Sequence, residues 1–146
     1  MPWSVVPVKG VQPNSHRGIA FLVCAEQQQV NGEAIYRKLK EKNKRNVLSR
    51  FDYWLAGNTC DKYFHGWPNL ADDKECFVFK WKQACANHRL YGFLCHPKPS
   101  AMSFQTCILV LHSQKTDQTD FSYLAHINKL RTLPEVIRAV EKAFPE

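Results

Sequence analysis

The amino-acid sequence predicts a single α+β domain. Its 146 residues suffice for one hydrophobic core, and 45% of them are hydrophobic, so we expect residues 1–146 to fold as one unit. Strand-like and helical patterns follow in the order one strand, two helices, three strands and two helices. Because strands and helices do not alternate, this order excludes a doubly wound parallel sheet and favours an α+β fold.

The first 25 residues contain one predicted strand. Residues 1–18 hold several residues that break regular structure, and we expect them to form an irregular N-terminal arm. These breakers are Pro2, Pro7, Gly10, Pro13 and Gly18. Residues 19–25, IAFLVCA, form a continuous apolar run, which predicts a strand covered on both faces inside the sheet.

Two helices are predicted next. Asn31 is expected to cap the first, in which Ile35 and Leu39 face the core. The second has one apolar stripe and ends at Gly57. The stripe consists of Val47, Leu48, Phe51, Trp54 and Leu55. Together they predict an N-terminal helical hairpin, followed by a loop over residues 60–74.

Three strands and two helices complete the predicted fold. Strand-like runs over residues 76–82, 89–95 and 104–112 are joined by short loops, which favour antiparallel neighbours. Asp120 is expected to cap a short helix, and the sequence Thr132-Leu133-Pro134-Glu135 predicts a capping box at the start of the last helix.

The charge balance indicates the class of partner. The chain has 20 Lys and Arg against 13 Asp and Glu, a formal charge of +7, which favours nucleic acid or an acidic protein. The alternative is a basic surface that only keeps the protein soluble. The basic run from Arg37 to Arg50 is typical of a solvated helix face, but it could also follow a phosphate backbone.

Cysteine spacing and hydropathy indicate a cytoplasmic protein. The six cysteines are never closer than nine residues, so no CxxC pair offers zinc or redox spacing. Four of them lie in strand-like runs, where a thiol packs as a small hydrophobe: Cys24, Cys76, Cys95 and Cys107. We find no signal peptide and no apolar run of roughly 18 residues, and therefore expect reduced thiols and no membrane partner.

Strand alternation predicts a basic platform on the sheet. It sends Lys80 and Lys82 to one face of their strand, while Arg89 and Tyr91 share a face on the next. If the registers match, these side chains meet, and His112 extends the platform. Fixed cations stabilise the dianionic phosphorane formed when a 2′-hydroxyl attacks its own phosphodiester, and Lys or His can transfer the protons without a metal. Alternatively, the lysines are solvated and Arg89 forms an ordinary salt bridge.

Other motifs give weaker signals. His65 beside Trp67 could stack on a base or act as an acid and base, although a histidine beside aromatic residues is more often packed. The sequence contains no GxxxxGK[ST], GxGxxG, HExxH or GxSxG motif. Nucleotide hydrolysis, dinucleotide redox chemistry and serine hydrolysis therefore lack support, and we predict no cofactor and no metal.

The segments FVFKWKQACANHRLYGFLCHP and FQTCILVLHSQKTDQTD, from residue 77 onward, resemble the RelE/HigB superfamily of bacterial toxins. Lys80 and Lys82 fall on the family's basic strand, Arg89 matches the arginine of its sheet, and Lys115 lies in its Lys-Thr segment. The resemblance implies a RelE-like twisted antiparallel sheet with an N-terminal helical hairpin and C-terminal helices. It further implies metal-independent mRNA cleavage on the ribosome and an antitoxin that masks the basic face.

These observations lead us to expect the toxin of a toxin–antitoxin system, a ribosome-dependent mRNA endoribonuclease with an antitoxin partner. The alternatives are a non-catalytic RNA-binding or protein-interaction module on the same fold, and an inert phage-derived remnant. The candidate catalytic residues are Lys80, Lys82, Arg89, His112 and Lys115. The candidate RNA-binding residues are Lys38, Lys42, Lys44, Arg45 and Tyr91.

Overall fold

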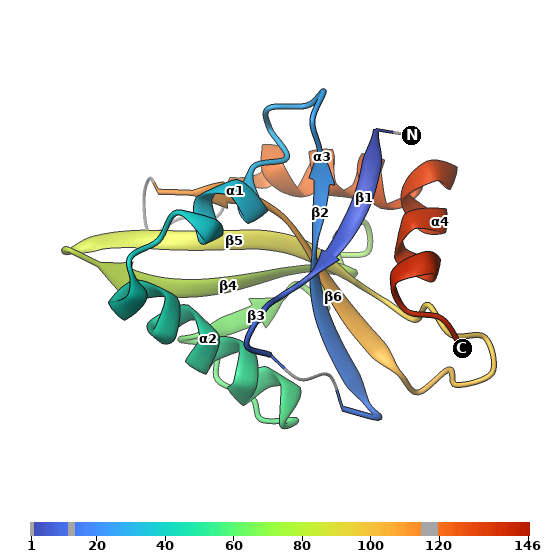
Figure 1. The fold of residues 1–146 in the computed structure, drawn as a ribbon, viewed down its shortest axis with the longest axis horizontal. Coiled ribbons are helices and arrows are strands. Elements are labelled where there is room, and N and C mark those ends of the chain that lie inside the picture. The colour runs from blue at the N-terminus through green and yellow to red at the C-terminus, as the bar shows by residue number, and fades with distance from the viewer. Residues whose placement is uncertain (1, 12–13, 115–119) are drawn as a thin grey trace.

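The computed structural model describes residues 2–11, 14–114 and 120–146, and within them six strands form one sheet with helices on both faces (Figure 1). The strands are β1 Trp3–Pro7, β2 Arg17–Cys24, β3 Phe64–Gly66, β4 Cys76–Gln83, β5 Ala86–Cys95 and β6 Gln105–Ser113. The helices are α1 Gly32–Arg37, α2 Glu41–Leu55, α3 Phe121–Arg131 and α4 Pro134–Ala143. The predicted α+β class is confirmed.

The sheet is mixed, in the order β1-β2-β6-β5-β4-β3. The predicted antiparallel pairing holds for β4 with β5 and for β5 with β6. The fully antiparallel sheet that the family resemblance implied is wrong, because β2 and β6 run parallel with Ile19 opposite Cys107. Two helices and three strands separate β2 from β6 in the chain, so the connection is long enough for a parallel crossover.

The predicted irregular arm over residues 1–18 is wrong for Trp3–Pro7, which form β1 and pair antiparallel with β2 with Trp3 opposite Cys24, and for Arg17 and Gly18, which begin β2. The prolines do not interrupt this strand: Pro2 precedes it, and Pro7 ends it at the sheet edge, where a missing N–H is tolerated. The chain therefore enters the fold as a strand and not as a helical hairpin.

The two helices after β2 each pack on the sheet. Helix α1 packs against β6 and β2, whereas α2 packs mainly against β4. The helices also contact each other, because the ring centroids of Tyr36 and Phe51 lie 6.1 Å apart. Asn31 precedes α1 as predicted, but its side chain does not cap the helix. Its Oδ1 instead accepts the backbone N–H of His112 at 2.8 Å and so ties the helix to β6.

Several predicted boundaries shift. The predicted loop over residues 60–74 contains β3, and β5 begins at Ala86, so Asn87 and His88 are in a strand. Asp120 caps α3 as predicted, since its side chain accepts the Ser122 N–H at 3.0 Å. The capping box is wrong, because Thr132 ends α3 and its hydroxyl donates to carbonyls of that helix.

The sheet separates two apolar layers. On one face α3 and α4 bury Leu124, Ile127 and Val140 against strand residues such as Val78. On the other face α1 and α2 bury residues such as Phe51. All six cysteines are free thiols, and the four predicted to lie in strands do so. Among the described residues, no helix is long and apolar enough to cross a membrane.

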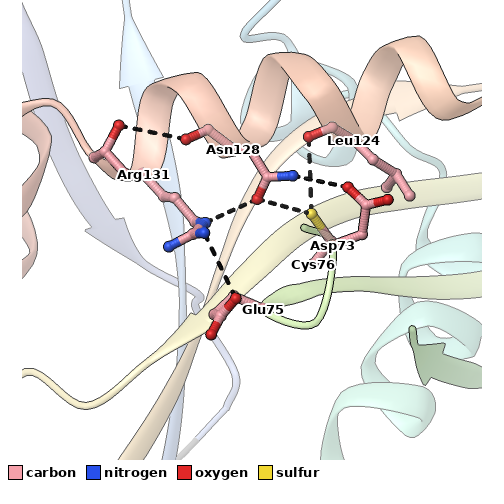
Figure 2. A network of polar contacts seen from close by, with 7 residues as sticks. Asp73, Glu75, Cys76, Leu124, Asn128 and Arg131 are labelled. Atoms are coloured by element: carbon pink, nitrogen blue, oxygen red, sulfur yellow. Dashed lines mark hydrogen bonds and ion pairs between the residues drawn. The ribbon is translucent and has the colours of Figure 1, made fainter. Parts of the chain in front are cut away.

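A polar network fastens α3 to the segment before β4 (Figure 2). The Asn128 amide donates to Asp73 Oδ1 at 2.8 Å, and its Oδ1 accepts from Arg131 Nε at 2.8 Å and from the Cys76 thiol at 3.6 Å. Burial raises the pKa of Cys76 to about 12, so the thiol stays protonated and can donate. Arg131 also pairs with Glu75 at 3.5 Å.

Replacing Asn128 tests this network. Asn128→Ala removes a donor and an acceptor shared by three partners, and we expect the free energy of unfolding to fall by about 1–3 kcal/mol in urea titrations. Lys129→Ala, an exposed change on the same helix, should stay within about 0.5 kcal/mol of wild type. Equal stability of the two variants would show that the network contributes nothing.

Candidate nucleic-acid interface

Lys80 and Arg89 lie directly opposite each other on neighbouring strands. In the antiparallel register of β4 and β5, Lys80 pairs with Arg89 and Lys82 with Asn87, so these side chains point to one face of the sheet. The predicted meeting of Lys80, Lys82 and Arg89 on one face is therefore confirmed. Burial lowers the pKa of Lys80, and the adjacent Arg89 lowers it further.

A two-residue turn sets this register. Ala84 and Cys85 connect β4 to β5 with φ angles of 50° and 65°, and Gln83 pairs with Ala86 across the turn. Two-residue hairpin loops with positive φ at both positions match the twist of the flanking strands. Neither residue is glycine, so the turn costs about 1–2 kcal/mol per residue.

A hollow of about 330 Å³ opens along β4 beyond the end of β3, and we call it the edge hollow. Its charged lining residues are Arg50, Lys62, Lys80, Lys82 and Arg89. Arg50 is held in place, because its Nε donates to the Lys80 carbonyl at 3.3 Å and its guanidinium lies 3.7 Å from the Tyr63 ring. The edge hollow is thus lined by cations, of which Arg50 is held in a defined position.

A second hollow of about 840 Å³, the hairpin hollow, lies between the α1–α2 connection and the β4–β5 turn. It shares Asn46 and Lys82 with the edge hollow, and its further cations are Lys38, Lys40 and Lys42. None of the described residues that line either hollow is acidic. The two hollows together form one continuous basic surface.

The predicted RNA-binding residues divide between two places. Lys38 and Lys42 line the hairpin hollow, as expected for a phosphate-binding surface. Lys44 and Arg45 instead line a third hollow between the helices and β1, the β1 hollow, together with two carboxylates. These carboxylates belong to Glu33 and Glu41.

The prediction that Tyr91 contacts RNA is wrong, because only 1% of the residue is exposed. Its ring stacks with Trp67 at 6.4 Å and lies 5.5 Å from Tyr123 of α3. Alternation does place Tyr91 on the face of Arg89, but the docked helix covers this part of the face.

The prediction that His112 extends the platform is also wrong. His112 pairs with Leu90, the neighbour of Arg89, and so points to the opposite face. There its Nε2 lies 2.9 Å from Nδ1 of His88, on which Trp81 stacks at 5.2 Å. Burial and the neighbouring His88 lower the pKa of His112 to about 4. Lys115 lies outside the described residues.

His65 joins the platform; the sequence raised an acid–base role for it but did not include it among the candidate catalytic residues. It lies on β3 opposite Val78, which places it on the face of Lys80. Burial lowers the pKa of His65, and Lys80 and Arg89 lower it further. The available signal was the His65-Gly66-Trp67 sequence, but a three-residue strand is too short for a pattern of alternation to establish.

Comparisons with protein-family models, curated proteins and solved structures found no match for this chain. The described residues contain no group of three His, Cys, Asp or Glu side chains placed to hold a metal ion. The strand registers bring together Lys80, Lys82 and Arg89 on one face of the sheet, with His65 on the same face, and Lys82 also lines the hairpin hollow.

The contact between His88 and His112 should make stability depend on pH. Because the folded-state pKa of His112 lies near 4, below the usual 6.5, its contribution is complete above pH 6.5 and is lost as the pH falls towards 4. We expect a loss of about 2 kcal/mol, discounted for partial exposure. The measurement is urea unfolding between pH 7.5 and pH 4.5.

Carboxylates titrate in the same range, so matched variants isolate the histidine. His112→Gln should flatten the pH dependence, whereas His16→Gln, at an exposed site, should leave it as in wild type. Parallel curves for all three proteins would contradict the assignment.

Proposed function

We propose that this protein is the toxin of a toxin–antitoxin system, a metal-independent endoribonuclease that cuts mRNA on the ribosome. The observation that carries the proposal is the Lys80–Arg89 pair on one face of a rigid sheet. Lys82, on the same face, lies where the edge hollow meets the hairpin hollow. The resemblance of the β4–β6 sequences to RelE/HigB toxins points the same way.

The chemistry assigns a role to each cation. When a 2′-hydroxyl attacks the adjacent phosphate, two negative charges develop on the phosphorane oxygens, and the Arg89 guanidinium can bind two such oxygens with parallel N–H groups. Lys80 can protonate the leaving 5′-oxygen, and its lowered pKa makes it a stronger acid than an ordinary lysine. The products are a 2′,3′-cyclic phosphate and a 5′-hydroxyl.

The two hollows supply the binding surface. Eight Lys and Arg side chains from the described residues line them, so an RNA strand in contact with Lys38, Lys40 and Lys42 can continue past Lys82 to Lys80. This contact is with phosphates and carries little base specificity. An acidic antitoxin segment laid over the same surface would exclude RNA by occupying the same cations.

Cleavage is tested with variants of the facing pair. Induced expression of the wild type should arrest growth and cut transcripts, while Arg89→Ala and Lys80→Ala should each lower the cutting rate by about 10²-fold or more, because each removes transition-state stabilisation. Transcript ends are mapped on translating ribosomes. Lys142→Ala, on exposed α4 surface, is the matched control and should cut at the wild-type rate. A wild type that neither slows growth nor cuts transcripts excludes the nuclease.

Binding is tested separately by its dependence on salt. Replacing Lys38, Lys40 and Lys42 with Ala should weaken RNA binding and reduce the slope of log K against log salt by about 2, since each phosphate contact to a single strand contributes about 0.7. The control removes three charges that line the β1 hollow, namely Lys9, Lys44 and Arg45, and should change the slope little. Equal loss in both triple variants would place binding elsewhere. Salt-dependent binding without cleavage would select the non-catalytic RNA-binding module.

A further inference from the structure

We propose that His65 is the general base of this site and removes the proton from the attacking 2′-hydroxyl; this role rests on the proposed function. The sequence raised an acid–base role for His65 but did not place it beside the basic strands. The inference comes from the edge strand β3, which brings His65 to the face where Lys80 and Arg89 meet.

The register of three strands places the groups. His65 lies opposite Val78 of β4, and Lys80 is two residues further along the same face of β4, directly opposite Arg89 of β5. Diagonal neighbours on one face of a sheet lie about 7–8 Å apart, within reach of a shared substrate phosphate. His65 and Lys80 also line one hollow of about 720 Å³ along β3.

Two contacts determine the tautomer and the orientation of the His65 imidazole. Its Nδ1 lies 3.0 Å from the Gly66 carbonyl oxygen, which can only accept, so Nδ1 carries the hydrogen and donates. In the neutral ring Nε2 therefore keeps its lone pair and is the basic atom. The Trp67 ring packs edge-on at 5.0 Å and limits rotation of the imidazole.

The surrounding charges favour the neutral base. Lys80 from β4 and Arg89 from β5 oppose protonation, and Asp61 from the segment before β3 favours it. Burial is the largest influence, and the net effect lowers the pKa of His65 below 6.5. At pH 7 the ring is thus ready to accept a proton.

In the proposed step, Nε2 of His65 takes the 2′-hydroxyl proton, and the 2′-oxygen forms a bond to phosphorus. The bond from phosphorus to the 5′-oxygen breaks, and that oxygen takes a proton from Lys80. The imidazolium then releases its proton to water, and Lys80 regains one from water. No oxidant, reductant or metal enters the step.

The experiment compares the wild type with His65→Gln, using His16→Gln as the matched control, on translating ribosomes programmed with a defined mRNA. Loss of a general base should slow cleavage by about 10²–10⁴-fold while RNA binding is unchanged. The pH–rate profile should lose the acidic limb that reports His65 protonation. His16→Gln should keep both the rate and the profile of wild type.

A second measurement does not depend on activity. NMR titration should show the neutral His65 ring protonated at Nδ1, and Lys80→Met, which removes a neighbouring cation, should raise its pKa. A ring protonated at Nε2, or an unmoved pKa, overturns the assignment. If wild type cuts mRNA and His65→Gln cuts with the same rate and pH profile, only the role of His65 falls. If wild type cuts nothing, the proposed function falls and this role with it.

Discussion

The register between β4 and β5 is the constraint on which the candidate site depends. Strand side chains alternate with a period of two, so a slip of one residue would carry Arg89 to the opposite face and separate it from Lys80. The strained Ala84–Cys85 turn fixes the hairpin, and the stacking of Trp81 on His88 supports the same register on the other face. The backbone strain at Ala84 and Cys85 is thus associated with the register that places Lys80 opposite Arg89.

The opposite face of β4 stabilises the strand that carries the charges. Like charges directly opposite each other destabilise a strand pair, and Lys80 and Arg89 are such a pair. Beneath them Phe79 is fully buried and contacts Phe51 at 4.9 Å and Phe64 at 5.5 Å. Apolar packing on one side therefore holds together cations that repel on the other, and a bound polyanion would relieve that repulsion.

The sequence predicted features that depend on residues close together in the chain, but not features that depend on the pairing of distant strands and helices. Alternation within one strand correctly placed Lys80 and Lys82, because it needs no knowledge of neighbouring strands. The position of His112 relative to Arg89 depends on the register of β5 and β6, which shifts at Tyr91 and Gly92. A Cβ on Gly92 would lie 2.2 Å from a β6 carbonyl, a closeness that no local pattern reveals. The burial of Tyr91 likewise depends on how α3 docks.

The basic run over residues 37–50 shows that the residues around each cation, more than the net charge of the chain, determine where a phosphate backbone can bind. In α2, Lys42, Asn46 and Arg50 are four residues apart and share the helix face towards β4, where both hollows lie. Lys44 and Arg45 face the β1 hollow, where carboxylates lie beside them. Helix geometry thus divides one cationic stretch into a surface whose described lining residues include no carboxylate and a surface that Glu33 and Glu41 share. Only the first surface continues to Lys80 and Arg89, and a phosphate backbone bound there would contact cations from both the helix and the sheet.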